Sequence, residues 1–252
     1  MKNHRLSLSI LLLSLFSNLL IADEKLDASI TTLQHEWAKA NYSTAKDAQE
    51  TAFKNLTEQA HQVTEKHANA PEALIWEGIA NAGYAKAKGG LGALKVAEKA
   101  RDLLLAAEKA NPNALQGSAY TSLGSLYYKV PSWPIGFGDK KKAKTYLEKA
   151  LQINPDGIDP NFFYADYLSE RSEYKQAIEF YEKALTYDPN LKESIFNLAS
   201  TYEMLGDRDK AITFYQSSIR KSIESQYTQD LSQAYAGLSN TYKAIGKIDS
   251  GI

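Results

Sequence analysis

The side chains of this sequence that could hold a metal ion are its histidines and a short run of aspartates. His61 and His67 are six residues apart, whereas two metal ligands on one helical face need a spacing of four. Asp156, Asp159 and Asp166 lack the glycine and the terminal glutamate of a calcium loop. The chain has no cysteine, which excludes disulfides, thiol catalysis and thiolate-bound zinc. We therefore expect no metal and no cofactor, and we interpret the histidines as surface residues.

Two glycine-rich stretches could cradle a phosphate, but their context argues against it. Residues 89–92 and 136–140 follow no predicted strand, and neither completes the G-x-x-x-x-G-K-[ST] pattern. No Ser-His-Asp set or carboxylate pair indicates an active site, so we do not expect an enzyme. The formal net charge of −1 provides no basic field for nucleic-acid phosphates, so nucleic acid is not an expected partner.

The first 22 residues have the pattern of an export signal. Lys2 and Arg5 precede an apolar run over 6–21, and the small Ala22 is followed by an acidic residue. The sequence thus predicts a signal peptide over 1–22 and a periplasmic or secreted protein that keeps no membrane span after its removal. A retained membrane helix is the alternative, although the run is short for a bilayer. Without a cysteine, lipid attachment at an N-terminal cysteine is excluded.

A period of 34 residues organises the second half of the chain. Ala143, Ala177 and Ala211 are spaced by this period, and the apolar residues around them recur with it. Repeats of about this length indicate stacked helix-turn-helix units. Apolar residues three and four apart predict helices almost throughout. Gly138-Asp139 and Gly206-Asp207 predict a left-handed glycine that ends one helix and an aspartate that caps the next.

A motif at the start of several predicted helix pairs agrees with the period. Tyr120-x-x-Leu123-Gly124-x-x-Tyr127 resembles the W-x-x-L-G-x-x-Y signature of the tetratricopeptide repeat. Related spacing begins at Ile195 and at Tyr235. Small residues in this motif let two helices approach closely. The sequence predicts an all-α fold, a right-handed α-solenoid of tetratricopeptide helix-turn-helix repeats.

The repeats divide the chain into segments of unequal regularity. We expect a divergent N-terminal helix pair over 26–71, irregular repeats over 72–155 with insertions near 87–92 and 130–138, two regular repeats over 158–225, and a lone C-terminal helix and tail over 232–252. A lone last helix can cap a stack. The alternative is that the last apolar face of the array lies open.

The insertion at 130–138 carries two large aromatic residues among prolines and glycines. Trp133 and Phe137 either fold back onto the array or offer an apolar contact to a partner. Both alternatives stay open at the level of sequence.

The concave groove of a helical repeat array is the other candidate surface. Its expected lining consists of residues beside the packing positions of each first helix: Tyr128, Asp159, Phe162, Asp166, Glu193, Phe196, Asn197 and Glu203, with Thr121, Ser125 and Ser200. This lining is acidic and aromatic, and Thr121, Glu193 and Asn197 stand where a carboxylate-clamping repeat domain places basic or amide residues. By charge complementarity we expect a neutral or basic extended peptide or protein as the partner.

Several stretches together resemble a group of exported bacterial tetratricopeptide proteins: residues 89–94, 117–124, 131–139 and 159–164. More distantly, the irregular pair, the insertion and the following Asp-x-x-Lys-Ala are similar to the T component of TRAP-associated transport systems. That component is a lipoprotein, and this chain lacks the required cysteine. The resemblance implies either a non-catalytic scaffold or adaptor, or a periplasmic small-ligand carrier in which the two insertions close over an apolar pocket.

Overall fold

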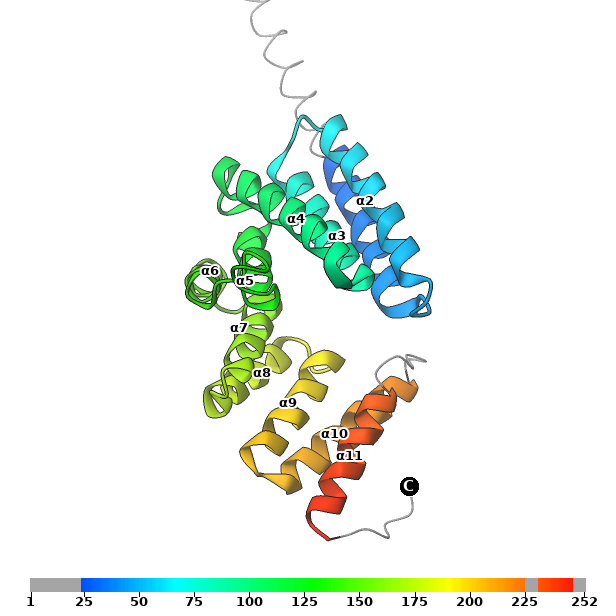
Figure 1. The fold of residues 1–252 in the computed structure, drawn as a ribbon, viewed down its shortest axis with the longest axis vertical. Helices are drawn as coiled ribbons and strands as arrows, with labels where there is room; N and C mark the ends of the chain where they lie inside the picture. Colours follow the sequence, from blue (N-terminus) through cyan, green and yellow to red (C-terminus); the bar gives the residue numbers. More distant parts are fainter. Residues whose placement is uncertain (1–23, 225–230, 247–252) are drawn as a thin grey trace, which may run out of the picture. The chain divides into compact units, whose positions relative to one another are not determined.

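The computed structural model describes residues 24–224 and 231–246. The predicted signal peptide lies outside these residues. The described chain is all-α: helices follow one another, and no strand is formed in these two ranges (Figure 1). Within them, every helix is too short or too polar to cross a lipid bilayer.

The chain forms two compact units that divide between Leu103 and Leu104. The first contains a helix over 24–38, a π-helical turn η1 (Lys39–Ser43), α2 (Gln49–Lys66), α3 (Pro71–Lys88) and most of α4 (Gly90–Ala110). Its core gathers around Phe53 and Leu56, which are buried with Ile30 and Leu33. The ring of Phe53 lies so close to α3 that a Cβ at Gly83 would be 2.3 Å from it.

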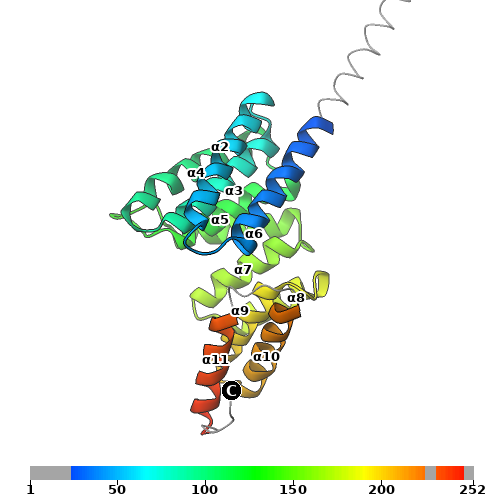
Figure 2. The ribbon, with the colours of Figure 1, turned by 90° about the vertical axis from the view of Figure 1, so that its right-hand side faces the viewer.

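The second unit is a row of helix pairs. Its elements are η2 (Ala114–Gly117), α5 (Ser118–Lys129), α6 (Lys140–Ile153), α7 (Ile158–Glu170), α8 (Tyr174–Tyr187), α9 (Lys192–Leu205), α10 (Arg208–Glu224) and α11 (Leu231–Ala244). Helices α5 and α6, α7 and α8, and α9 and α10 pack as pairs, and α11 packs on α10 (Figure 2). The first helices also contact one another in order, from α5 to α7 to α9 to α11, whereas the second helices α6, α8 and α10 make no contact of similar extent among themselves. The first helices therefore form the tighter layer of the unit.

Small side chains allow the helices of each pair to approach closely, as the sequence predicts. Ala143, Ala177 and Ala211 are completely buried. Gly124 faces α6 at a distance that leaves no room for a side chain, since a Cβ there would lie 2.5 Å from Leu147 Cγ. The predicted close contacts are confirmed, and the fold class is the expected helical-repeat solenoid.

The two Gly-Asp signals end and restart helices by different means. Gly206 has a φ of +92° and ends α9 in the predicted left-handed conformation. Asp139 caps α6, because its Oδ1 accepts hydrogen bonds from the backbone N–H groups of Lys141 at 2.9 Å and Lys142 at 3.0 Å. The expectation of a left-handed glycine is wrong for Gly138. That residue is needed for space instead, since a Cβ would lie 1.9 Å from the carbonyl oxygen of Val130.

Candidate functional site

Two half-buried phenylalanines repeat on the first helices of neighbouring pairs. Phe162 in α7 and Phe196 in α9 are one period apart, and each packs edge-on against a tyrosine of its own second helix. The ring centroids of Phe162 and Tyr181 are 5.9 Å apart at an interplanar angle of 61°, and Phe196 and Tyr215 show the same values. The tyrosines are buried, so they hold the phenylalanine rings in place at the surface. The repeated sequence thus produces a repeated aromatic surface.

An acidic group lies beside the first of these rings. Asp166 Oδ2 accepts a hydrogen bond from the Tyr128 hydroxyl at 2.7 Å and lies 2.9 Å from Lys129 Nζ, while Oδ1 is 3.5 Å from the Tyr181 hydroxyl. Burial, and then the neighbouring carboxylate of Asp166, raise the pKa of Tyr128 well above its usual range. Burial lowers the pKa of Lys129, but Asp166 and Glu170 outweigh this effect and raise it. The carboxylate is therefore held in one orientation by charged and neutral donors.

A similar tyrosine-to-acid contact occurs one repeat later from a different position. The Tyr215 hydroxyl donates to Glu203 Oε2 at 2.7 Å. Burial, followed by this bond, raises the pKa of Tyr215 above its usual value. At the beginnings of α7 and α9, Asp159 is exposed and Glu193 is half-buried. We call the set Asp159, Phe162, Asp166, Glu193, Phe196, Asn197 and Glu203 the α7–α9 face.

The residues that the sequence predicts to line the groove differ in how far they are buried. Those on α7 and α9 are half-buried or exposed, and their helices are in contact. Tyr128 and Thr121 on α5 are buried, with only 6% of each residue exposed. Tyr128 therefore lies beneath the surface, where it orients Asp166. The spacing alone could not separate these depths, because the burial of Tyr128 depends on its contacts with Asp166 and Tyr167 of α7.

The insertion after α5 is a closed loop with an exposed tip. Gly138 N–H donates to Pro131 O at 2.9 Å, and Asp139 N–H donates to Tyr127 O at 2.8 Å. Phe137 is half-buried, and its ring packs edge-on against that of Tyr127 at 5.7 Å. Trp133 is 86% exposed. Of the two aromatic residues in the loop, Phe137 therefore folds back onto the array, whereas the Trp133 side chain extends into solvent.

A buried carboxylate in the first unit was missed by the sequence reasoning. Glu77 in α3 is 1% exposed, and its Oε1 lies 3.1 Å from both His61 Nδ1 and Lys99 Nζ. Its Oε2 is buried with no hydrogen-bond partner. The His61 side chain is exposed at the surface, as the sequence predicts, but its contact with a core acid was not expected. The helical spacing could have indicated this burial, because Glu77 lies on the same face of α3 as Ala73 and Ala80, which are also buried.

In the described ranges, the side chains that could bind a metal ion do not cluster. No group of three or more histidine, aspartate or glutamate side chains there is placed to hold an ion.

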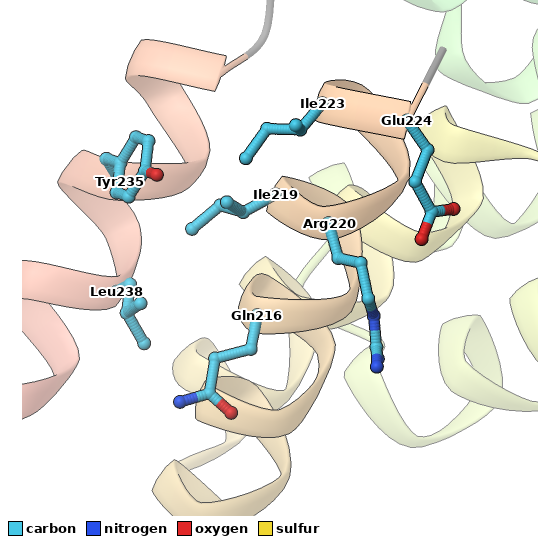
Figure 3. A pocket seen from close by; sticks show the side chains of 7 residues that line it. All are labelled: Gln216, Ile219, Arg220, Ile223, Glu224, Tyr235 and Leu238. Carbon is cyan, nitrogen blue, oxygen red and sulfur yellow. The ribbon is translucent and has the colours of Figure 1, made fainter.

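An apolar hollow lies between the last two helices. It has a volume of about 520 Å³ and is lined by Gln216, Ile219, Arg220, Ile223, Glu224, Tyr235 and Leu238. Figure 3 shows Tyr235 and Leu238 on α11 facing Ile219 and Ile223 on α10. Neither insertion, at 87–92 or at 130–138, contributes a residue to this lining.

Comparison with known proteins identifies the repeats. Residues 168–221 and residues 135–156 each match a family described as Tetratricopeptide repeat. A search of curated proteins found no match.

Solved structures support the same fold. A thermophilic TPR protein from Thermus thermophilus has 17% identity to this chain and a TM-score of 0.61, with 84% of this chain and 98% of that chain covered. BtubC (BKLC) from P. vanneervenii has 21% identity and a TM-score of 0.55, with 81% and 86% covered. At these identities the likeness shows the fold alone. The chain is therefore an all-α protein that carries tetratricopeptide repeats.

Proposed function

We propose that this protein is a non-catalytic adaptor that binds an extended segment of a partner protein through the α7–α9 face. The observation that carries the proposal is the pair of matched rings, Phe162 on Tyr181 and Phe196 on Tyr215, with the same centroid distance and angle one repeat apart. The tetratricopeptide fold is that of a protein-interaction scaffold, and its first helices line the surface that such arrays use for binding. Two preoriented rings one repeat apart suit a chain that extends from α7 to α9.

The charge of the face favours a neutral or basic segment. Helix α7 carries Asp159, Asp166 and Glu170, and α9 carries Glu193 and Glu203 with one lysine. Lys129 of α5 pairs with Asp166 and Glu170, so Asp159 and Glu193 carry most of the negative charge that a partner would meet. A carboxylate that approached this face would meet like charge, whereas a lysine or arginine would gain charge-assisted hydrogen bonds. Apolar side chains of the segment would pack against Phe162 and Phe196.

Export is part of the proposal, supported by the sequence pattern of residues 1–22. An adaptor that crosses the inner membrane would meet its partner in the periplasm or outside the cell. Detection of the mature protein in the periplasmic fraction, with its N-terminus determined by Edman sequencing, tests this step. Recovery of the uncleaved chain from the cytoplasm would contradict it.

The binding proposal is tested by affinity capture with two matched double variants. Phe162→Ala with Phe196→Ala removes both rings of the α7–α9 face. Phe180→Ala with Phe214→Ala removes two half-buried rings, also one period apart, from the second helices α8 and α10. We expect only the first variant to lose the partner recovered by the wild-type protein from a native cell-envelope extract. Equal recovery by both variants would refute the role of this face.

Synthetic peptides give a direct measure of the charge preference. Two fluorescent peptides share the same apolar residues, and one carries lysines where the other carries glutamates. We expect the basic peptide to bind more tightly and to weaken as salt increases. The variant Glu193→Gln should bind it less well, with a smaller dependence on salt. Tighter binding of the acidic peptide would exclude the proposed complementarity.

A small-ligand carrier is the second candidate, favoured by the apolar hollow between α10 and α11. Its ligand would contact Ile219 and Leu238 rather than the insertions. A ligand that binds only the folded protein raises the melting temperature. A rise with a small apolar metabolite that disappears in Ile219→Asn would support the carrier, and no rise with any such compound would exclude it.

A further inference from the structure

The loop after α5 has an apolar tip, which is not part of the α7–α9 face. Trp133 is 86% exposed and Ile135 is 63% exposed. Large apolar side chains grouped at an exposed tip mark an interaction site more often than do single exposed residues. This tip is convex, so it suits a surface that deforms around it.

Contacts at the two ends of the loop fix its conformation. Its ends are joined by the hydrogen bond from Gly138 N–H to Pro131 O, and Phe137 packs on Tyr127. Within the loop, Ile135 N–H donates to Ser132 O at 3.2 Å. The tip is therefore ordered before it meets any partner, so that binding costs little conformational entropy.

A run of lysines begins at the base of this loop. Residues 129–144 contain five lysines and one aspartate, in a chain whose formal net charge is −1. Lys129 is paired with Asp166 and Glu170. Lys140 and Lys141 are exposed and form no ion pair within the part of the chain that the structure describes. Their positive charge lies in the first turn of α6, directly after the loop in the chain.

We propose that the tip, Trp133 and Ile135, with Lys140 and Lys141, docks on the surface of an anionic lipid bilayer. Tryptophan favours the membrane interface because its ring is apolar and its indole N–H is polar. Lysines beside it attract anionic headgroups. An ordered apolar loop with flanking basic residues binds by both effects together, and no shape-matched cavity in the partner is needed. This inference does not depend on the adaptor function.

Vesicles of phosphatidylcholine with phosphatidylglycerol, and vesicles of phosphatidylcholine alone, are the probes. Residues 6–21 are themselves apolar, so the decisive readouts are local to Trp133 in the full-length protein. The spectrum of Trp133→Phe, subtracted from that of the wild-type protein, isolates one of the three tryptophans. We expect its emission to shift to shorter wavelength with the anionic vesicles, and brominated lipids to quench it.

Charge variants test the role of the lysines. Lys140→Gln with Lys141→Gln should raise the vesicle concentration needed for half of the Trp133 shift by about fivefold for each charge removed. Lys175→Gln with Lys243→Gln removes the same charge from exposed positions on α8 and α11, and it should leave that concentration within about twofold of wild type. Ile135→Ser should weaken the shift without unfolding the protein, as the far-ultraviolet circular dichroism will verify.

Three results would overturn the proposal. One is a Trp133 signal that brominated lipid does not quench. Another is an equal response to neutral and anionic vesicles. The third is loss of a captured protein partner in Trp133→Ala with no response of Trp133 to vesicles, which would assign the tip to a protein surface.

Discussion

Substitution of Gly124 by alanine tests whether glycine-sized contacts hold the helix pairs together. A Cβ at this position would lie 2.5 Å from Leu147 Cγ, 2.7 Å from Leu147 Cδ2 and 3.3 Å from Ala143 O. Carbon atoms in favourable contact are about 3.5 to 4.0 Å apart, so the added methyl group overlaps its neighbour by about 1 Å. Leu147 is completely buried and cannot turn away without displacing other core atoms.

The expected magnitude combines two opposing effects. Overpacking of a core costs about 1 to 3 kcal/mol, whereas exchange of glycine for alanine inside a helix stabilises it by about 1 kcal/mol. Gly124→Ala should therefore lower the free energy of unfolding by about 1 kcal/mol. In a Leu147→Ala background the overlap with Leu147 is absent and the 3.3 Å contact with Ala143 O remains, so the same substitution should stabilise by up to about 1 kcal/mol. The coupling between the two positions is then up to about 2 kcal/mol.

Urea unfolding followed by circular dichroism at 222 nm measures all four proteins of this cycle. Gly92→Ala is the matched control, since its nearest neighbour is the flexible end of the Lys88 side chain at 2.8 Å, and it should stabilise by up to about 1 kcal/mol. The reasoning is refuted if Gly124→Ala has the same effect in both backgrounds.

Three further outcomes follow from the contacts described. Asp139→Ala should lower stability by about 1 kcal/mol in urea unfolding, because it removes the cap of α6, whereas Asp139→Asn should retain most of the stability; equal losses would contradict the capping role. Lys99→Met should destabilise by about 1 to 2 kcal/mol, because Glu77 keeps its buried position and loses a partner, and Glu77→Gln in that background should recover part of the loss if the charge is the cause. Alkaline titration should show unfolding stability that is constant from about pH 7 to 9 and then falls above about pH 10. Burial raises the pKa values of Tyr128 and Tyr181, so these groups keep their protons in the folded protein after the unfolded chain has lost them. Each contributes a decline of about 1.4 kcal/mol per pH unit in that window, and constant stability up to pH 11 would contradict the burial of these hydroxyl groups.

The helix pairing of the second unit could be predicted because its causes are local and periodic. Ala143, Ala177 and Ala211 recur at one spacing, and each is buried where a small residue is required. Capping by Asp139 is likewise readable from a few adjacent residues.

What sequence reasoning missed depends on contacts between residues far apart in the chain. The role of Gly138 as a space-saving residue arises from the path of the loop that returns to Val130. Glu77 resembles a solvent-exposed acid by type, and its burial depends on the partners that α2 and α4 bring to it. Trp133 and Phe137 are equally aromatic, and only the closure of their loop decides which ring packs.

The sequential contacts of the first helices have a mechanical consequence. Helix α7 meets α5 and α9, and α9 meets α11, so each junction can rotate slightly without breaking the next. Small rotations of neighbouring helix pairs in the same sense would add up along the row of pairs. The spacing between Phe162 and Phe196 is set at the junction of α7 and α9, whereas the contact of each ring with its tyrosine lies within one pair.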